Sequence, residues 1–132
     1  MLAQVLKAAG YEVFNARTGS EALALARQHQ GEVGLLLCDV VLPDRSSHEV
    51  ALRIRELCPG MKTLFISGYP LEVLIESGRM RPETIYGENN FFLPKPFLPR
   101  ELIRRVDGIL ALRASASAGI EQSGGLRGNA AH

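Results

Sequence analysis

Three polar side chains in this sequence are of the types that phosphoryl transfer uses, and each follows an apolar run. Asp39 ends the stretch "GLLLCD", Ser67 ends "KTLFIS", and Lys95 follows "NFFLP". A carboxylate can attack phosphorus as a nucleophile, while a hydroxyl and an ammonium group can hydrogen-bond and neutralise phosphoryl oxygens. Because a buried, unpaired carboxylate is costly, Asp39 needs a partner, a metal or a chemical role.

Each of these residues alone has a simpler explanation. An Asp after a strand often caps a helix or a turn, Ser67 precedes Gly68 as turn residues do, and a lone Lys95 is usually solvated. The hypothesis therefore depends on the fold. Adjacent parallel strands lie about 5 Å apart, so Asp39 and Ser67 could share a ligand, and Lys95 would have to cover about 10 Å with its long side chain.

The elements that must position these residues alternate along the chain. Residues 78–90 are polar and are predicted to form a loop. The alternation predicts an α/β fold with a parallel sheet covered by helices on both faces. Apolar spacing predicts helices over 2–9, 20–29, 47–57, 71–77 and 99–112, and strands over 11–16, 33–38, 62–67 and 90–93.

Two helix starts carry sequence signals. Ser46 and Glu49 form an S-x-x-E pattern, which predicts a capping box for the helix over 47–57. Gly19 or Ser20 is expected to cap the helix over 20–29.

Composition limits the function classes. The 132 residues suit one domain, and the net charge of +1 predicts no attraction to nucleic acid or to an anionic membrane. No apolar run approaches the roughly 20 residues of a membrane span. Cys38 and Cys58 are expected to be buried, reduced thiols of a cytoplasmic protein, with a disulfide left open. Residues 1–112 are the expected domain, and 113–132, rich in Ala, Ser and Gly, a disordered tail or linker.

Three stretches in this order, "LLLCDVVLP", "LFISGYP" and "FFLPKPF", resemble the receiver domain of two-component response regulators. "ISGY" together with "KPF" looks especially like the receivers of hybrid sensor histidine kinases. The resemblance covers residues 1–112 and implies a flavodoxin-like, doubly wound parallel sheet of order 2-1-3-4-5. It also implies a phosphorelay module that is not an enzyme beyond its own phosphorylation and dephosphorylation. Its phosphoryl donor would be a phosphohistidine of a histidine kinase or a histidine phosphotransfer domain.

The resemblance assigns roles to single positions. Asp39 matches the phospho-acceptor, Ser67 the switch hydroxyl, and Lys95 the lysine that pairs with the phosphoryl group. Phe92 matches the aromatic residue that rotates on activation. Val41 matches the position whose backbone carbonyl binds Mg²⁺ together with the phospho-acceptor.

The chain departs from the family pattern at its N-terminus. Receivers begin with a strand that ends in an acidic pair of metal ligands, whereas this chain begins within the expected first helix, and no acid precedes Glu12. Of the Mg²⁺ ligands, only Asp39 and the carbonyl of Val41 are recognisable. The missing strand is the central one, so two inner strand edges are expected to lie unpaired. A truncated start, a degenerate receiver, and a strand exchanged within a homodimer are three open explanations.

Two smaller features follow from the same comparison. Ser47 stands where the family usually has Gly, and little damage is expected there. The Lys95–Pro96 peptide bond is expected to be cis.

Three other functions remain as alternatives. Haloacid-dehalogenase-like phosphatases also use Asp, Ser or Thr, and Lys, but they need a second acid where this chain has Val41. His48 and Glu49 faintly resemble the H-box of a kinase dimerisation segment, but no ATP-binding glycine boxes accompany them. The main rival is a degenerate, receiver-like interaction module that is not phosphorylated. Mg²⁺ affinity that is lost on Asp39→Asn would favour phosphotransfer. No direct contact with nucleic acid or membrane is expected.

Overall fold

The alternation of helices and strands is present in a computed structural model, which describes residues 2–42, 44–85, 87–116 and 130–131. Each predicted helix and strand has an observed counterpart. The elements are α1 (Leu2–Ala8), β1 (Val13–Phe14), α2 (Gly19–Gln28), β2 (Leu35–Asp39), α3 (Ser47–Leu57), β3 (Lys62–Ser67), α4 (Leu71–Glu76), α5 (Pro82–Ile85), β4 (Asn90–Pro94), α6 (Pro99–Ala116) and β5 (Ala130–Ala131).

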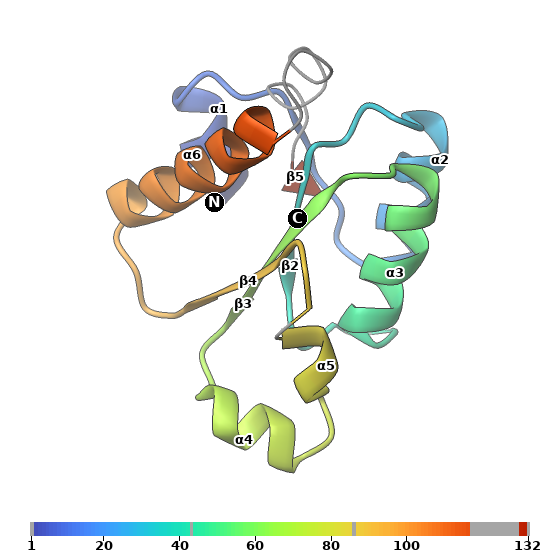
Figure 1. Ribbon diagram of the computed structural model, residues 1–132, viewed down its shortest axis with the longest axis vertical. Helices are drawn as coiled ribbons and strands as arrows, with labels where there is room; N and C mark the ends of the chain where they lie inside the picture. The colour runs from blue at the N-terminus through green and yellow to red at the C-terminus, as the bar shows by residue number, and fades with distance from the viewer. Residues whose placement is uncertain (1, 43, 86, 117–129, 132) are drawn as a thin grey trace.

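The strands β2, β3 and β4 form one parallel sheet in that order. Leu35 pairs with Lys62 at the start of the first ladder, and Ser67 pairs with Pro94 at the end of the second. Parallel strands point the same way, so their carboxyl ends meet at one edge of the sheet. This arrangement, with helices on both faces (Figure 1), confirms the expected flavodoxin-like α/β fold class.

The apolar run before Asp39 is continuous because both faces of β2 are buried. Leu35 and Leu37 pack on the side of α1 and α6, whereas Leu36 and Cys38 pack on the side of α2 and α3. Successive side chains of a strand alternate between faces, so a strand covered on both sides must be apolar at every position. Each fully buried leucine contributes about 2 kcal/mol relative to an exposed one. Two cores thus hold β2 at the centre of the molecule.

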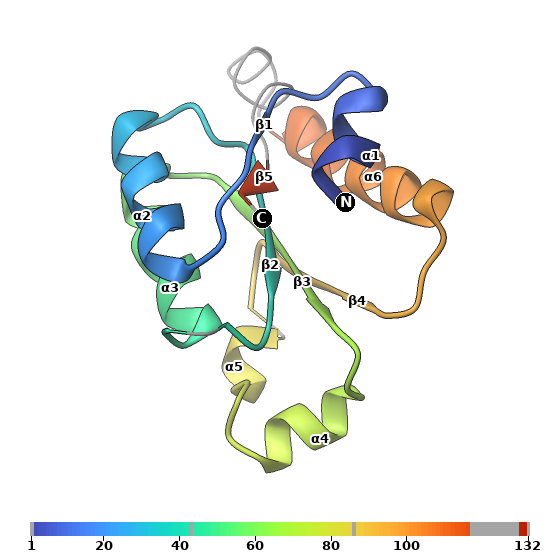
Figure 2. The same cartoon turned by 180° about the vertical axis from the view of Figure 1, so that it is seen from behind.

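The position between β1 and β2 is taken by the C-terminal strand. β5 pairs in parallel with β1, Val13 with Ala130 and Phe14 with Ala131, and it also contacts β2. Figures 1 and 2 both show β5 beside these two strands. The spatial order is β1, β5, β2, β3 and β4. It matches the expected order 2-1-3-4-5, with β5 in the place of the first strand.

Two expectations about the chain ends change accordingly. The prediction that the inner edge of β1 lies unpaired is wrong, because β5 pairs with this edge. Unpaired backbone groups at an inner edge favour such pairing. α6 continues to Ala116, four residues past the predicted helix end at 112. Residues 117–129 and 132 lie outside the described residues, so the predicted domain boundary and disordered tail remain predictions.

The helix starts differ from both sequence expectations. Thr18, not Gly19 or Ser20, caps α2, because its hydroxyl accepts a hydrogen bond from the Glu21 N–H. The predicted capping box of α3 is also wrong: Ser46 makes no side-chain cap bond. Its Oγ instead lies 2.9 Å from Nδ1 of His48, which competes for the hydroxyl.

The segment predicted as a loop over 78–90 contains the short helix α5. Leu74 and Met80 are both buried, and the Met80 N–H donates to the Leu74 carbonyl at 3.1 Å, which closes the end of α4. These contacts bring α5 back towards α3 and β4 (Figure 1). None of the helices described is long and apolar enough to cross a membrane.

Candidate functional site

Asp39 and Lys95 form an ion pair across the carboxyl edge of the sheet. Asp39 is the last residue of β2, Lys95 directly follows β4, and Lys95 Nζ lies 3.3 Å from Asp39 Oδ1. The Lys95 backbone N–H donates to the Ser67 carbonyl at 2.8 Å, which positions the lysine at the end of β3. The predicted reach of Lys95 past the intervening strand is confirmed.

Ser67 completes the group from the middle strand. It is buried, and its Oγ accepts a hydrogen bond from the Tyr69 N–H at 2.9 Å. A hydroxyl has one proton, so this contact leaves the Ser67 O–H able to donate to a ligand. The predicted convergence is confirmed by a surface hollow of about 210 Å³ whose lining includes all three side chains: Asp39, Val41, Ile66, Ser67, Gly68, Tyr69 and Lys95.

The ion pair itself adds little to stability. Asp39 and Lys95 keep 31% and 45% of their side-chain surface exposed, and pairs this accessible contribute about 0–1 kcal/mol. Both groups are therefore accessible to a ligand. The Lys95–Pro96 peptide bond next to them is cis, as expected.

The two cysteines are free and buried, as expected. Burial, and secondly the charge of Asp39, raise the pKa of Cys38 to about 12. The Cys38 thiol therefore stays protonated near neutral pH, although it adjoins the site. It is a packing residue and not a nucleophile.

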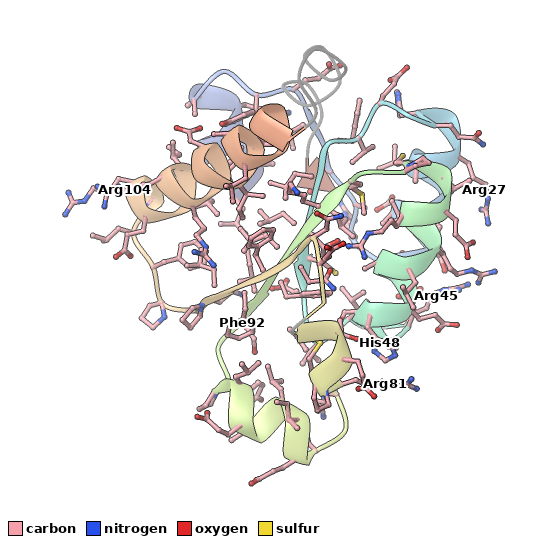
Figure 3. All side chains as sticks on the ribbon, viewed as in Figure 1. Arg27, Arg45, His48, Arg81, Phe92 and Arg104 are labelled. Atoms are coloured by element: carbon pink, nitrogen blue, oxygen red, sulfur yellow. The ribbon has the colours of Figure 1, made fainter. Side chains whose placement is uncertain are left out.

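Phe92 and Val41, the two other predicted site residues, have different surroundings. Phe92, labelled in Figure 3, packs partly buried on the core beneath α2 and α3, and its carbonyl accepts a hydrogen bond from Arg105 at 3.3 Å. Val41 is exposed and forms an antiparallel bridge with Ser46, which folds the loop after β2 back on itself. Only Val41 of these two lines the hollow.

The side chains at this edge do not fit a Mg²⁺ site by themselves. Mg²⁺ takes a near-octahedral shell of about six oxygens. Among the residues that the structure describes, the hollow offers one carboxylate, that of Asp39, which already pairs with Lys95. Across the part of the chain that the structure describes, no three His, Cys, Asp or Glu side chains are grouped as metal ligands.

Sequence reasoning missed Asp44, which holds the loop after the site against α2. Its carboxylate accepts hydrogen bonds from the Gly19 N–H at 2.9 Å and from the Ser20 N–H and hydroxyl at 3.2 and 2.9 Å. Asp44 follows Asp39 by five residues, but the first residue of α2, Gly19, lies 25 residues before Asp44 in the sequence. The only local signal was a polar residue next to Pro43, which is typical of any turn.

Two curated relatives are similar over most of this chain. It is 31% identical over 107 residues to the sensor kinase CckA of Brucella abortus (strain 2308), covering 81% of this chain and 11% of CckA. It is 31% identical over 109 residues to the response regulator receiver protein CpdR of the same strain, covering 83% of this chain and 84% of CpdR. The chain thus spans about a tenth of the length of CckA but most of CpdR.

Solved structures and a family model agree with these relatives. The receiver domain from the hybrid histidine kinase CckA superposes with a TM-score of 0.66 at 30% identity, covering 82% of this chain and 84% of that one. A CheY-like receiver domain protein from Methanospirillum hungatei JF-1 gives 0.69 at 29% identity, covering 88% and 86%. The family model described as the response regulator receiver domain matches residues 1–107. This chain belongs to the response regulator receiver domain family.

Proposed function

We propose that this chain accepts a phosphoryl group on Asp39 from a phosphohistidine of a histidine kinase or histidine phosphotransfer domain. The observation that carries the proposal is the 3.3 Å pair of Asp39 and Lys95 in one hollow with Ser67. A nucleophile, a cation and a hydroxyl donor thus share one edge of a rigid sheet. This set matches the needs of phosphoryl transfer better than those of a helix cap or a turn.

The proposed transfer uses each of the three side chains. A carboxylate oxygen of Asp39 attacks phosphorus, a P–O bond forms as the P–N bond to the donor imidazole breaks, and the leaving imidazole keeps the electron pair of that bond. The Lys95 ammonium moves from the carboxylate to the phosphoryl oxygens and offsets their charge. Ser67 then donates its hydroxyl proton to a phosphoryl oxygen.

The same step supplies a switch. Ser67 Oγ now holds the Tyr69 N–H, so a Ser67 drawn to the phosphoryl group pulls on the loop that leads into α4. Phe92 is the aromatic residue that we expect to turn with it. The surface around the loop that leads into α4 would then change its contacts with partner proteins. Such a change would signal that Asp39 is phosphorylated.

Acetyl phosphate with Mg²⁺ tests the proposal on the full chain. Intact-mass spectrometry should show the gain of one phosphoryl group for the wild type and none for Asp39→Asn. Asp44→Asn removes a neighbouring charge outside the hollow and should keep the adduct. No adduct on the wild type, or an adduct that survives Asp39→Asn, overturns the proposal.

A contact-only module is the second candidate, and one observation favours it. The described side chains around Asp39 supply too few oxygen ligands for Mg²⁺. The attack of a carboxylate on a phosphoryl group brings two anions together, and a divalent metal usually offsets their repulsion. Titration with Mg²⁺ or Mn²⁺ separates the two candidates. Affinity that is lost on Asp39→Asn supports phosphotransfer, and an equal response of both proteins supports the contact-only module.

A further inference from the structure

A second cationic group lies away from Asp39 and is anchored by Arg55 of α3. One terminal nitrogen of Arg55 donates to Thr63 Oγ1 at 2.9 Å, to Asn90 Oδ1 at 2.8 Å and to the Asn89 carbonyl at 3.5 Å. All three acceptors are neutral. Its Nε is buried and has no hydrogen-bond partner among the described residues.

This environment is unusual for an arginine. Burial lowers the pKa of Arg55, and no carboxylate in the described ranges lies within ion-pair distance of it. Partly buried cations are normally paired with an acid, because neutral acceptors only partly replace water around the charge. The hydrogen bonds to β3 and β4 hold the guanidinium in place, so its uncompensated charge has a fixed position.

Two further basic side chains share a hollow with Arg55. The hollow holds about 290 Å³ between α3, α5 and the start of β4. Figure 3 shows His48 on α3 near Arg81, which precedes α5. The charge of Arg81 adds to burial in lowering the pKa of His48, whereas Glu49 opposes that shift. Among the described residues, Glu83 is the only acid in the lining, which is His48, Ala51, Leu52, Arg55, Arg81, Glu83, Thr84 and Asn90.

The surrounding surface extends the positive field. An adjoining hollow of about 250 Å³ shares His48 and adds Arg45 and Arg79 to the lining. Among the described residues, the linings of these two hollows hold four arginines and one acid, Glu83, and Arg45 also lies 3.9 Å from Asp44. A planar guanidinium suits tetrahedral or planar oxyanions, to which it donates in pairs.

We propose that the hollow between α3, α5 and β4 binds a phosphate-type oxyanion, with Arg55 and Arg81 as its charged ligands and Thr84 at its rim. This goes beyond the proposed phosphotransfer, because none of the side chains involved lines the Asp39 hollow. The oxyanion would be free inorganic phosphate or the phosphate monoester of a nucleotide. An anion bound by Arg55 and Arg81 would link the C-terminal half of α3 to the segment that follows α4.

Titration with inorganic phosphate, at constant ionic strength, tests the site on the full chain. Amide and His48 ring resonances should shift saturably in the wild type, and Arg81→Gln should weaken binding by about tenfold. Arg104→Gln removes the same charge on α6 and should leave the affinity unchanged. Lys95→Gln should also leave it unchanged, which separates this site from the Asp39 hollow. A parallel titration with adenosine monophosphate identifies the source: tighter binding than phosphate indicates a nucleotide, and equal binding indicates the free ion.

Arg55 needs a variant that keeps the fold. Arg55→Lys retains the charge but lacks the planar guanidinium with a second terminal nitrogen for the ligand, so it should fold and yet bind phosphate more weakly than the wild type. Affinity that is equal in the wild type, Arg81→Gln and Arg55→Lys overturns the proposal. So does a loss that is equally large for Arg104→Gln, since that pattern indicates diffuse attraction, or an absence of saturable shifts in the wild type.

Discussion

Ser47, at the first position of α3, carries a cost that nothing in its surroundings offsets. Its side chain is fully buried, and its Oγ has no hydrogen-bond partner in the described part of the chain. The resemblance to receivers places Gly at this position, and little damage was expected from Ser. A buried hydroxyl that has lost water without gaining a partner costs about 1–3 kcal/mol.

Ser47→Ala should therefore raise the free energy of unfolding by about 1 kcal/mol, because it removes the hydroxyl and keeps most of the volume. Urea denaturation measures the change. Ser46→Ala is the matched control, since Ser46 is exposed and makes no cap bond, and it should change stability by less than about 0.5 kcal/mol. A lower stability for Ser47→Ala contradicts the prediction and indicates a bonding partner for the hydroxyl.

At the scale of elements, α2 is started by two residues from different parts of the chain. Thr18 caps it locally, and Asp44 from the loop after β2 binds its first two backbone N–H groups. An anion at a helix N-terminus is also favoured by the helix dipole. The loop that carries Asp44 directly follows Asp39, so the cap connects the candidate site to the N-terminus of α2.

This cap predicts a defined response to acid. The Gly19 N–H, and then the Ser20 hydroxyl, hold the pKa of Asp44 below its ordinary value, and Arg45 lies 3.9 Å away. A carboxyl whose pKa is lower in the folded state stabilises the fold above its unfolded pKa of about 3.9, and this contribution is lost as pH falls through the folded pKa. Asp44→Asn should thus be less stable than the wild type at pH 6, with a difference that shrinks towards pH 3.

Urea denaturation across this pH range measures the difference. Glu56→Gln, a change of the same charge on an exposed position of α3, is the control and should show no such trend. A stability difference between Asp44→Asn and the wild type that stays constant down to pH 3 contradicts the role of the Asp44 charge.

For the whole molecule, the notable feature is that two hydrogen-bonded sheets share one layer. β2, β3 and β4 form the larger sheet, and β1 joins it only by way of β5. The N-terminal and C-terminal segments therefore depend on each other. α1 also packs against α6 in one hydrophobic core, which is a second contact between an N-terminal and a C-terminal element.

Ala130→Pro should expose this dependence, because proline cannot donate its backbone hydrogen bond and resists pairing inside a sheet. Amide hydrogen exchange at Val13 and Phe14 should become faster, and stability should fall by about 1 kcal/mol. Ala130→Ser keeps the N–H and is the control. Unchanged exchange contradicts the pairing. Sedimentation of the wild type at several concentrations tells whether the pairing is within one chain or between two copies.

Local patterns were sufficient for most of the fold and for the core of the candidate site. The buried strands were recognised because apolar runs are local, and Asp39, Ser67 and Lys95 could be aligned because parallel strands end at one edge. The motifs around them indicated the receiver family. The predicted caps are wrong because a hydroxyl has several possible partners nearby: Ser46 contacts the ring of His48 and makes no cap bond to the backbone of α3.

The sequence by itself determined the α/β class, the strand ends and the three polar residues at them, because periodicity and motif spacing are written within short stretches. Only the tertiary structure decided that Asp44 caps α2, that β5 fills the place between β1 and β2, and that Arg55 shares a hollow with Arg81 while no acid among the described residues lies within ion-pair distance of it. Each of these depends on residues far apart in the chain. Such contacts depend on how the elements pack and on which backbone and charged groups are left needing partners, and no local pattern records that outcome.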